Sequence, residues 1–484
     1  MPKFVLLWTD VSVWLLVLAV LGYAVYVKRS PGLSANWRKV FTHASALASS
    51  LVLLFCLTIT VLDSVHFRSL LPPAAGADNS KPAYDTRTQS LMDALFSRVV
   101  NAREATYSRP LAYEGFTKES AVVDGQIVRT SPRLKFGGAH LTDPANQWLG
   151  DLTQRALLGA AGGLAVALAI SVLVLSRLSR HWQVPMGEGF RRVRERELAI
   201  PWHVAFWTAI VMALLIGPTL ALMNHYHVLG TDRTGNDVLY QALKSIRTAF
   251  VIGTLATVAT LPLAVTLGIM AGYFRAWVDE IIQYIYTVLS SVPNILLIAA
   301  CVLMVQVYLD KHPELFETGA ERSDLKLLLL CFILGATGWA GLCRLLRGET
   351  MKLRELDYVQ AANAFGVGHG RIMVRHIFPN VAHLMLISTV LEFSALILYE
   401  AVLSYVGVGV DPSMNSFGGM INLARTEMSR DPIVWWSFAA AFGFMVSLVL
   451  AANLFADGVR DAFDPRARVV RAKVLLKPAP KTAA

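Results

Sequence analysis

The chain has 484 residues, of which 55% are hydrophobic and only 16% are charged, and its formal net charge is +10. Its mean hydropathy of +0.50 excludes an ordinary soluble domain and indicates a membrane protein. Much of the positive charge flanks apolar runs, as in the cytoplasmic loops of membrane proteins, so we expect a lipid bilayer and not a nucleic acid as its partner.

About nine nearly uncharged runs approach the roughly 20 residues that a helix needs to cross a bilayer. Because these runs are continuous and do not alternate, they predict helices and not barrel strands. We expect an all-α polytopic membrane protein with spans near Val11–Val27, Ser45–Leu62, Ala156–Leu175, Val204–Met223, Phe250–Met270, Ile281–Val307, Leu327–Leu346, Val381–Val410 and Val434–Phe455.

The first run could instead be a secretory signal. However, Lys3 is the only early positive charge, Asp10 interrupts the run, and no clear small-residue cleavage site follows. We interpret the run as a retained span.

The loop between the third and fourth runs holds the densest cluster of positive charge, which places it in the cytoplasm. Threading from this loop puts Lys28–Thr42 and the basic C-terminal tail on the same side. An odd number of spans then leaves the N-terminus outside. The arginines of the loop are Arg177, Arg180, Arg191, Arg192, Arg194 and Arg196.

The spans divide the chain into five parts. Within the second part, apolar residues between Leu91 and Val100 recur at helical spacing, and Val122–Val128 predicts a hairpin with an Asp-Gly turn. We expect two N-terminal transmembrane helices in 1–62, a small α+β extracytoplasmic (periplasmic) domain in 63–150, a third helix with the Arg-rich loop in 151–203, six spans in 204–470, and a flexible cytoplasmic tail in 471–484.

Segment 356–380, between the seventh and eighth runs, mixes polar and apolar residues on the predicted cytoplasmic side. Ala361 and Ala362 allow close approach, while Gly366 and Gly368 break a helix and Pro379 precedes the next span. We expect two short helices joined at a glycine-rich turn, a shape suited to docking in a partner's groove.

This segment resembles the EAA loop of ABC importer permeases, in which an E-A-A triplet, a glycine and an I-x-L-P motif mark the helix that couples to the ATPase. Gln360-Ala361-Ala362, Gly366 and His376-Ile377-Phe378-Pro379 occupy those positions. Gln360 replaces a glutamate, and its neutral amide weakens any ion pair there. The resemblance implies a coupling surface made of Gln360, Ala361, Ala362, Gly366, Gly368, Arg371 and Pro379.

Four further motifs flank this segment: Gly230-Thr231-Asp232-Arg233-Thr234-Gly235-Asn236-Asp237, Ala271-Gly272-Tyr273-Phe274, Leu403-Ser404-Tyr405-Val406-Gly407-Val408-Gly409 and Asp457-Gly458-Val459-Arg460-Asp461. In their order and spacing they resemble the C-type permease of oligopeptide, dipeptide and nickel importers. The resemblance runs from about Val204 to Arg468 and implies a six-helix type I permease core, with the three N-terminal helices as an atypical extension.

The resemblance implies transport by alternating access across a bacterial inner membrane. A periplasmic binding protein would deliver peptides or similar solutes, a B-type permease would complete the path, and two ATPase subunits or domains would bind ATP and Mg²⁺. This chain has no G-x-x-x-x-G-K-S/T loop, so we expect no ATP site, enzymatic activity or cofactor in it. Its four cysteines lie in or at the end of apolar runs, where they act as small hydrophobes and not as metal ligands.

Polar residues inside spans are candidates for the transport path. Glu392 and Glu400 can share a helix face, since a carboxylate inside a membrane normally faces a partner or water. The alternative for both, and for Asn294, is a structural contact between helices. Asp232 and Asp237 could bind calcium, but a helix-cap and turn role is favoured.

Two other functions stay open. In an ion- or proton-coupled secondary transporter, Glu392 and Glu400 would be the coupling sites. In a receptor-like membrane protein, the external domain would bind a ligand and the spans would only anchor it.

Overall fold

Long apolar helices account for most of the chain. The computed structural model describes residues 2–71, 84–123, 126–195 and 198–463. In these ranges, eight helices are long and apolar enough to cross a bilayer, and one bent helix pair raises the number to nine. The expected all-α polytopic fold is confirmed. The eight are α1 (Trp8–Arg29), α3 (Ala44–Asp63), α6 (Pro144–His181), α8 (Trp202–Met223), α9 (Val238–Phe274), α11 (Asn294–Lys311), the continuous helix His369–Val406 and α18 (Trp436–Phe463).

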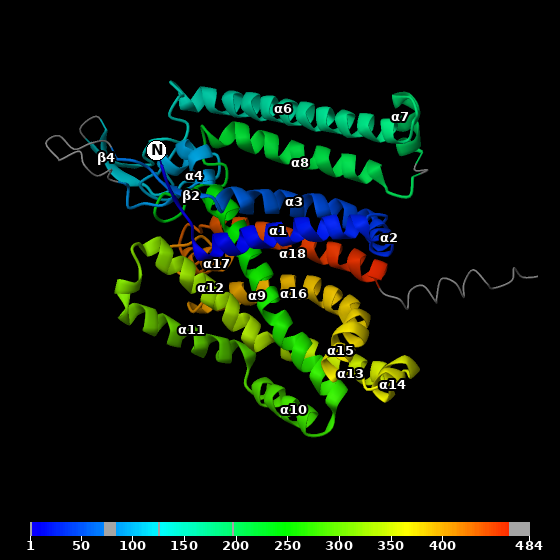
Figure 1. The fold of residues 1–484 in the computed structure, drawn as a ribbon. Coiled ribbons are helices and arrows are strands. Elements are labelled where there is room, and N and C mark those ends of the chain that lie inside the picture. The colour runs from blue at the N-terminus through cyan, green and yellow to red at the C-terminus, as the bar shows by residue number, and fades with distance from the viewer. Residues whose placement is uncertain (1, 72–83, 124–125, 196–197, 464–484) are drawn as a thin grey trace, which may run out of the picture.

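Shorter elements gather at the two ends of this helical array (Figure 1). One end carries β1 (Lys3–Val5), β2 (His66–Arg68), β3 (Gln89–Ser90), α4 (Leu91–Leu95), α5 (Ser97–Asn101), β4 (Glu119–Val123), β5 (Gln126–Thr130) and α17 (Phe417–Glu427). The other end carries α2 (Pro31–Val40), α7 (Met186–Arg194) and α14 (Asp357–Ala364). The basic segments that we threaded to the cytoplasm, as far as they are described, therefore share one end.

Two small antiparallel sheets lie at the end opposite α14. In the first, β2 pairs with both β1 and β3, and Lys3 lies opposite Arg68. This pairing holds the start of the chain beside the segment after α3. In the second, β4 and β5 form the expected hairpin, with Val123 opposite Gln126. The predicted Asp-Gly turn between them, like the tail 471–484 and Arg196, lies outside the described residues.

Helix α3 is inserted between helices of the core. It packs against α8 on one side and against α9 and α18 on the other (Figure 1). Its buried Cys56 and Ile59 join a cluster that includes Ile246 of α9 and Leu448 of α18. Helix α1 in turn packs against α12 (Gly319–Gly338) and α9. The N-terminal extension is therefore part of the helical packing and not an appendage to it.

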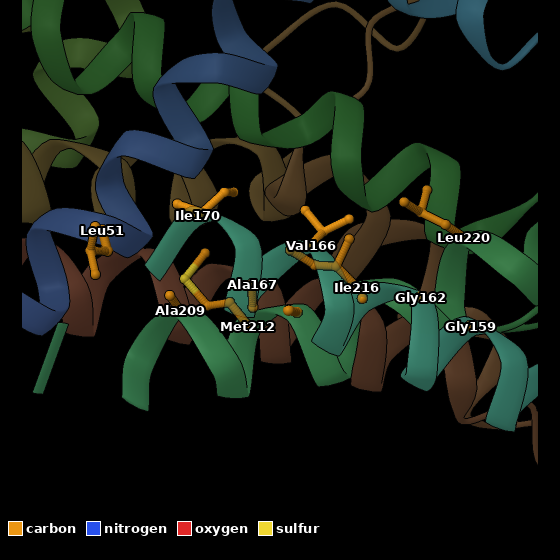
Figure 2. Close-up of a pocket in the computed structure, with 13 residues that line it drawn as sticks. Leu51, Gly159, Gly162, Val166, Ala167, Ile170, Ala209, Met212, Ile216 and Leu220 are labelled. Carbon is orange, nitrogen blue, oxygen red and sulfur yellow. The ribbon is translucent and has the colours of Figure 1, made fainter. Parts of the chain in front are cut away.

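Helices α6 and α8 touch backbone to backbone through glycines. A Cβ atom on Gly217 of α8 would lie 2.2 Å from the carbonyl oxygen of Gly159, and one on Gly163 would lie 2.4 Å from that of Ala213. Such small residues let membrane helices approach closely. Beside this contact lies a wholly apolar groove of about 530 Å³ (Figure 2), lined by Leu51, Gly159, Gly162, Gly163, Val166, Ala167, Ile170, Ala209, Met212, Ala213, Ile216, Gly217 and Leu220.

Two predicted spans are not straight continuous helices. The run Ile281–Val307 was expected as one span, but α10 (Ala276–Ser291) ends before Pro293 and α11 begins at Asn294. Proline has no N–H to donate and disfavours a helical residue before it, so Val292 is extended. Only α11 is long enough to span. In the run Leu327–Leu346, α12 and α13 (Ala340–Arg354) meet at a bend of 42°.

Candidate functional site at residues 356–380

The segment between α13 and the last long helices forms two short helices around a sharp turn, as its glycines predicted. Asp357 lies in the first turn of helix α14, where the partial positive charge of the helix N-terminus stabilises its carboxylate. The helix stops at Phe365, because Gly366 has a φ of +75°, which glycine adopts without strain. After Gly368, α15 (His369–Ile372) and a π-helical turn (Met373–Ile377) lead without a break into α16 (Phe378–Val406), which has Pro379 in its first turn.

One face of this segment is anchored in the largest apolar cluster at this end of the array. Val359, Ile372 and Ile377 are fully buried, together with Leu346 of α13 and Tyr273 of α9. Ala362 is half-buried against the same cluster. This close packing fixes α14 against α9 and α13.

Hydrogen bonds from Tyr273 hold the turn in place. Its hydroxyl lies 3.1 Å from Asn363 Oδ1 and 2.9 Å from His369 Nδ1, and so joins the two short helices. Arg354 Nη1 donates to the Tyr273 carbonyl oxygen at 2.6 Å. Gln360 does not use its amide for an ion pair; its Nε2 donates to the Glu355 carbonyl oxygen at 3.1 Å.

The opposite face is open to solvent and ends in an aromatic knob. Phe365 is 86% exposed, the largest such fraction among the big apolar side chains of the described residues. Of the seven predicted coupling residues, Ala362 is half-buried. The other six are exposed: Gln360, Ala361, Gly366, Gly368, Arg371 and Pro379. An exposed apolar side chain on a rigid support is typical of a protein docking surface and supplies no catalytic chemistry.

The two glutamates of α16 lie in different surroundings. Glu400 is 1% exposed and accepts a hydrogen bond from Ser404 Oγ at 2.6 Å, so its carboxyl group is enclosed within the chain. Glu392 is half-buried and makes no hydrogen bond or ion pair with any residue that the structure describes. Asn294 lies at the first position of α11, beside the break at Pro293, and is half-buried. Among the described residues, no hydrogen bond joins any two of these three.

Asp232 and Asp237 have the cap and turn roles that the sequence favoured. Asp237 Oδ1 accepts the backbone N–H of Tyr240 at 2.9 Å and caps α9, while Asp232 Oδ1 accepts those of Thr234 and Asn236 at 2.8 and 2.9 Å. Within the described ranges, no group of three or more His, Cys, Asp or Glu side chains is placed to hold a metal ion.

The sequence did not reveal an ion cluster that joins the extension to the core. His227 Nδ1 lies 2.9 Å from Asp237 Oδ2, and its Nε2 lies 3.5 Å from Glu104 Oε1. Burial disfavours the charged imidazole, but the two carboxylates outweigh it and raise the pKa of His227 to about 9. Glu104 also accepts backbone N–H groups from Lys135, Phe136 and Gly137. No spacing pattern links residues so far apart in sequence.

Residues 264–469 match a family model described as a binding-protein-dependent transport system inner membrane component. The chain is 33% identical over 245 residues to the oligopeptide transport system permease protein OppC of Mycobacterium tuberculosis, an alignment that covers 51% of this chain and 78% of that one. The match to the family model includes segment 356–380 and leaves the extension out.

Two further relatives give similar coverage. The glutathione transport system permease protein GsiD of Pectobacterium atrosepticum is 31% identical over 54% of this chain and 82% of its own. The dipeptide transport system permease protein DppC of Alkalihalophilus pseudofirmus is 27% identical over 58% and 90%. A solved structure titled as inward-facing MetNI methionine ABC transporter aligns with a TM-score of 0.36 at 14% identity, covering 47% of this chain and 97% of that chain, a likeness too weak to carry an inference.

Proposed function

Because the chain belongs to the family of binding-protein-dependent inner-membrane permeases of ABC importers, we propose that it forms half of a transmembrane path for peptides or peptide-like solutes. It is a transport subunit and not an enzyme. The peptide class is carried over from relatives whose names specify oligopeptide, dipeptide and glutathione transport. The second half of the path would be a B-type permease, so that the two permeases form a heterodimer.

The single observation that carries the coupling role is the knob at Phe365. It projects from the end of α14, on a turn that Tyr273 and the buried Val359 hold in place. The segment that carries it packs against α13 and continues along the chain into α16. In this proposal α14 docks on one of two ATPase subunits or domains, which bind ATP and Mg²⁺. When these close, α14 moves and α16 follows, because the π-helical turn continues into it without a break.

The orientation in the membrane follows from the same surface. If α14 meets a cytoplasmic ATPase, then α2, α7 and the end of α18 lie in the cytoplasm of the bacterium, and β1 with the N-terminus lies outside. A periplasmic binding protein would then deliver solute to the end that carries β4, β5 and α17.

The test is uptake by the purified assembly in liposomes, with the binding protein added outside and ATP enclosed. We expect ATP-dependent uptake of short peptides that Phe365→Ala lowers at least tenfold without removing the protein from the assembly. The matched control is Phe190→Ala, since Phe190 is also an exposed phenylalanine, 56% exposed on α7 at the same end. Uptake driven by a proton gradient without ATP would instead identify a secondary transporter.

A further inference from the structure

Glu392 lies midway along α16, between Phe378 and Val406. At a rise of 1.5 Å per residue it is about 21 Å from either end of the helix. The hydrocarbon core of a bilayer is about 30 Å thick, so a helix that crosses it symmetrically puts this carboxyl group close to the midplane. A charge costs the most free energy at that depth.

Nothing in the described chain compensates for this carboxyl group. Glu392 has no hydrogen bond or ion pair there, and neither of its oxygens is among the enclosed side-chain atoms that lack a partner. Its carboxyl oxygens are therefore exposed at the surface of the chain, although the residue as a whole is half-buried. A carboxyl group that faces lipid at the midplane is strongly disfavoured, so Glu392 needs water or a cation from outside this chain.

Two further polar side chains share its helix face. Ser388 lies one turn before Glu392 and Tyr399 lies two turns after it, and both are half-buried. Among the described residues, neither side chain donates or accepts a hydrogen bond, whereas the hydroxyl of the neighbouring Thr389 donates to the Met385 carbonyl oxygen at 2.7 Å. A stripe of three unsatisfied polar groups thus runs along the middle of the helix.

We propose that Ser388, Glu392 and Tyr399 line the solute path and that the Glu392 carboxylate binds the cationic amino group of the solute as it crosses. This inference rests on the proposed transport of peptides, whose amino termini carry that charge. The carboxylate accepts hydrogen bonds from the ammonium group of the solute. Water in the path weakens this contact enough for the solute to be released. Glu400, enclosed and bonded to Ser404, takes no part.

Water access tests the placement. In the assembled transporter, with the half-buried Cys301 replaced by alanine, Glu392→Cys, Ser388→Cys and Tyr399→Cys are exposed to a charged, membrane-impermeant methanethiosulfonate. We expect all three to be labelled, while Ser394→Cys, at a buried position on another face of α16, is not. Failure to label Glu392→Cys overturns the proposal.

Recognition of the amino-terminal charge is tested by measuring uptake of two peptide mixtures. One contains tri- to penta-alanine, and the other contains the same peptides with acetylated, uncharged amino termini. For Glu392→Gln we expect the KM of the free peptides to rise about ten- to hundredfold, the usual size of a charge-assisted hydrogen bond, with the acetylated peptides unchanged. Glu392→Asp should restore part of the difference. Equal effects on both mixtures, or no effect on either, would contradict the role of Glu392.

Two other outcomes are distinguishable. If Glu392→Gln no longer copurifies with the second permease, the carboxylate pairs with a cation of that subunit and the proposal fails. If the unmodified assembly imports neither mixture with ATP, the peptide class in the proposed function fails, and Cys labelling still decides whether Glu392 faces a path.

Discussion

Asp10, in the first turn of the N-terminal helix α1, accepts a hydrogen bond from Arg247 of α9 at 2.6 Å, with both side chains buried. Arg247 also donates to Thr9 Oγ1 at 2.9 Å, and the Thr9 backbone N–H donates to Asp324 of α12 at 2.9 Å. A helix outside the matched family region is thus tied to two helices of the core by enclosed charges.

We expect Asp10→Ala to lower the free energy of unfolding by about 3–5 kcal/mol, because it leaves the buried guanidinium of Arg247 short of its nearest carboxylate. Thermal unfolding of the purified protein in detergent measures this. The control is Glu349→Ala, which removes the exposed ion pair with Lys352 and should cost less than about 1 kcal/mol. Equal losses of unfolding free energy in the two variants would show that the buried Asp10–Arg247 pair stabilises the protein no more than an exposed pair does.

The turn after α14 depends on the backbone of Gly366. Gly366→Ala forces a side chain onto a φ of +75° and should cost about 1–2 kcal/mol locally, although a Cβ atom there meets nothing within 4 Å. Gly368→Ala, with a φ of −60° and equally open space, should be nearly neutral. Hydrogen exchange of the amides of residues 357–372 reads out the local cost. Equal exchange in the two variants would rule out backbone strain.

The contact between α6 and α8 requires glycine. Gly217→Leu places a Cβ atom 2.2 Å from the Gly159 carbonyl oxygen, so the helices must separate, at a cost of about 1–3 kcal/mol or more. Gly162→Leu points into the open groove, where a Cβ atom meets nothing within 4 Å, and should be tolerated. The unfolding temperature in detergent compares them. A larger loss for Gly162→Leu would contradict the packing of this pair.

Stability should fall in mild alkali because of His227. Its pKa is about 9 in the folded protein against 6.5 for an unperturbed histidine, so the folded state holds the proton more tightly. The contribution is fully present below pH 6.5 and is lost as the pH rises through 9, by on the order of 3 kcal/mol.

The check is unfolding temperature against pH for the natural protein and for His227→Gln. The neutral amide can still bond to Asp237 or Glu104 but does not titrate, so the fall between pH 6.5 and 9 should flatten in the variant. An unchanged pH profile would mean that another group causes it.

Apolar runs and backbone-restricting residues are properties of consecutive residues. The sequence alone therefore determined the helical membrane-spanning fold and the short helices of segment 356–380. Hydropathy predicted the spans, because crossing a bilayer requires about 20 apolar residues in a row. Glycine and proline near Gly366 and Pro379 predicted the short helices of segment 356–380, since both restrict the backbone directly. Pro293 is an equally local signal, and the expected single span there was wrong because this proline ends the helix before it.

Only the tertiary structure decided which helices are neighbours. Hydropathy identifies the segments that lie in the bilayer. It does not show which face of an apolar helix contacts another helix and which contacts lipid. The insertion of α3 between α8 and α18 depends on side-chain packing, such as the close approach of Ala46 to Gly458, which no periodicity specifies. The joining of Glu104 to His227 and of Asp10 to Arg247 depends on the same packing, because their partners are more than a hundred residues away along the chain.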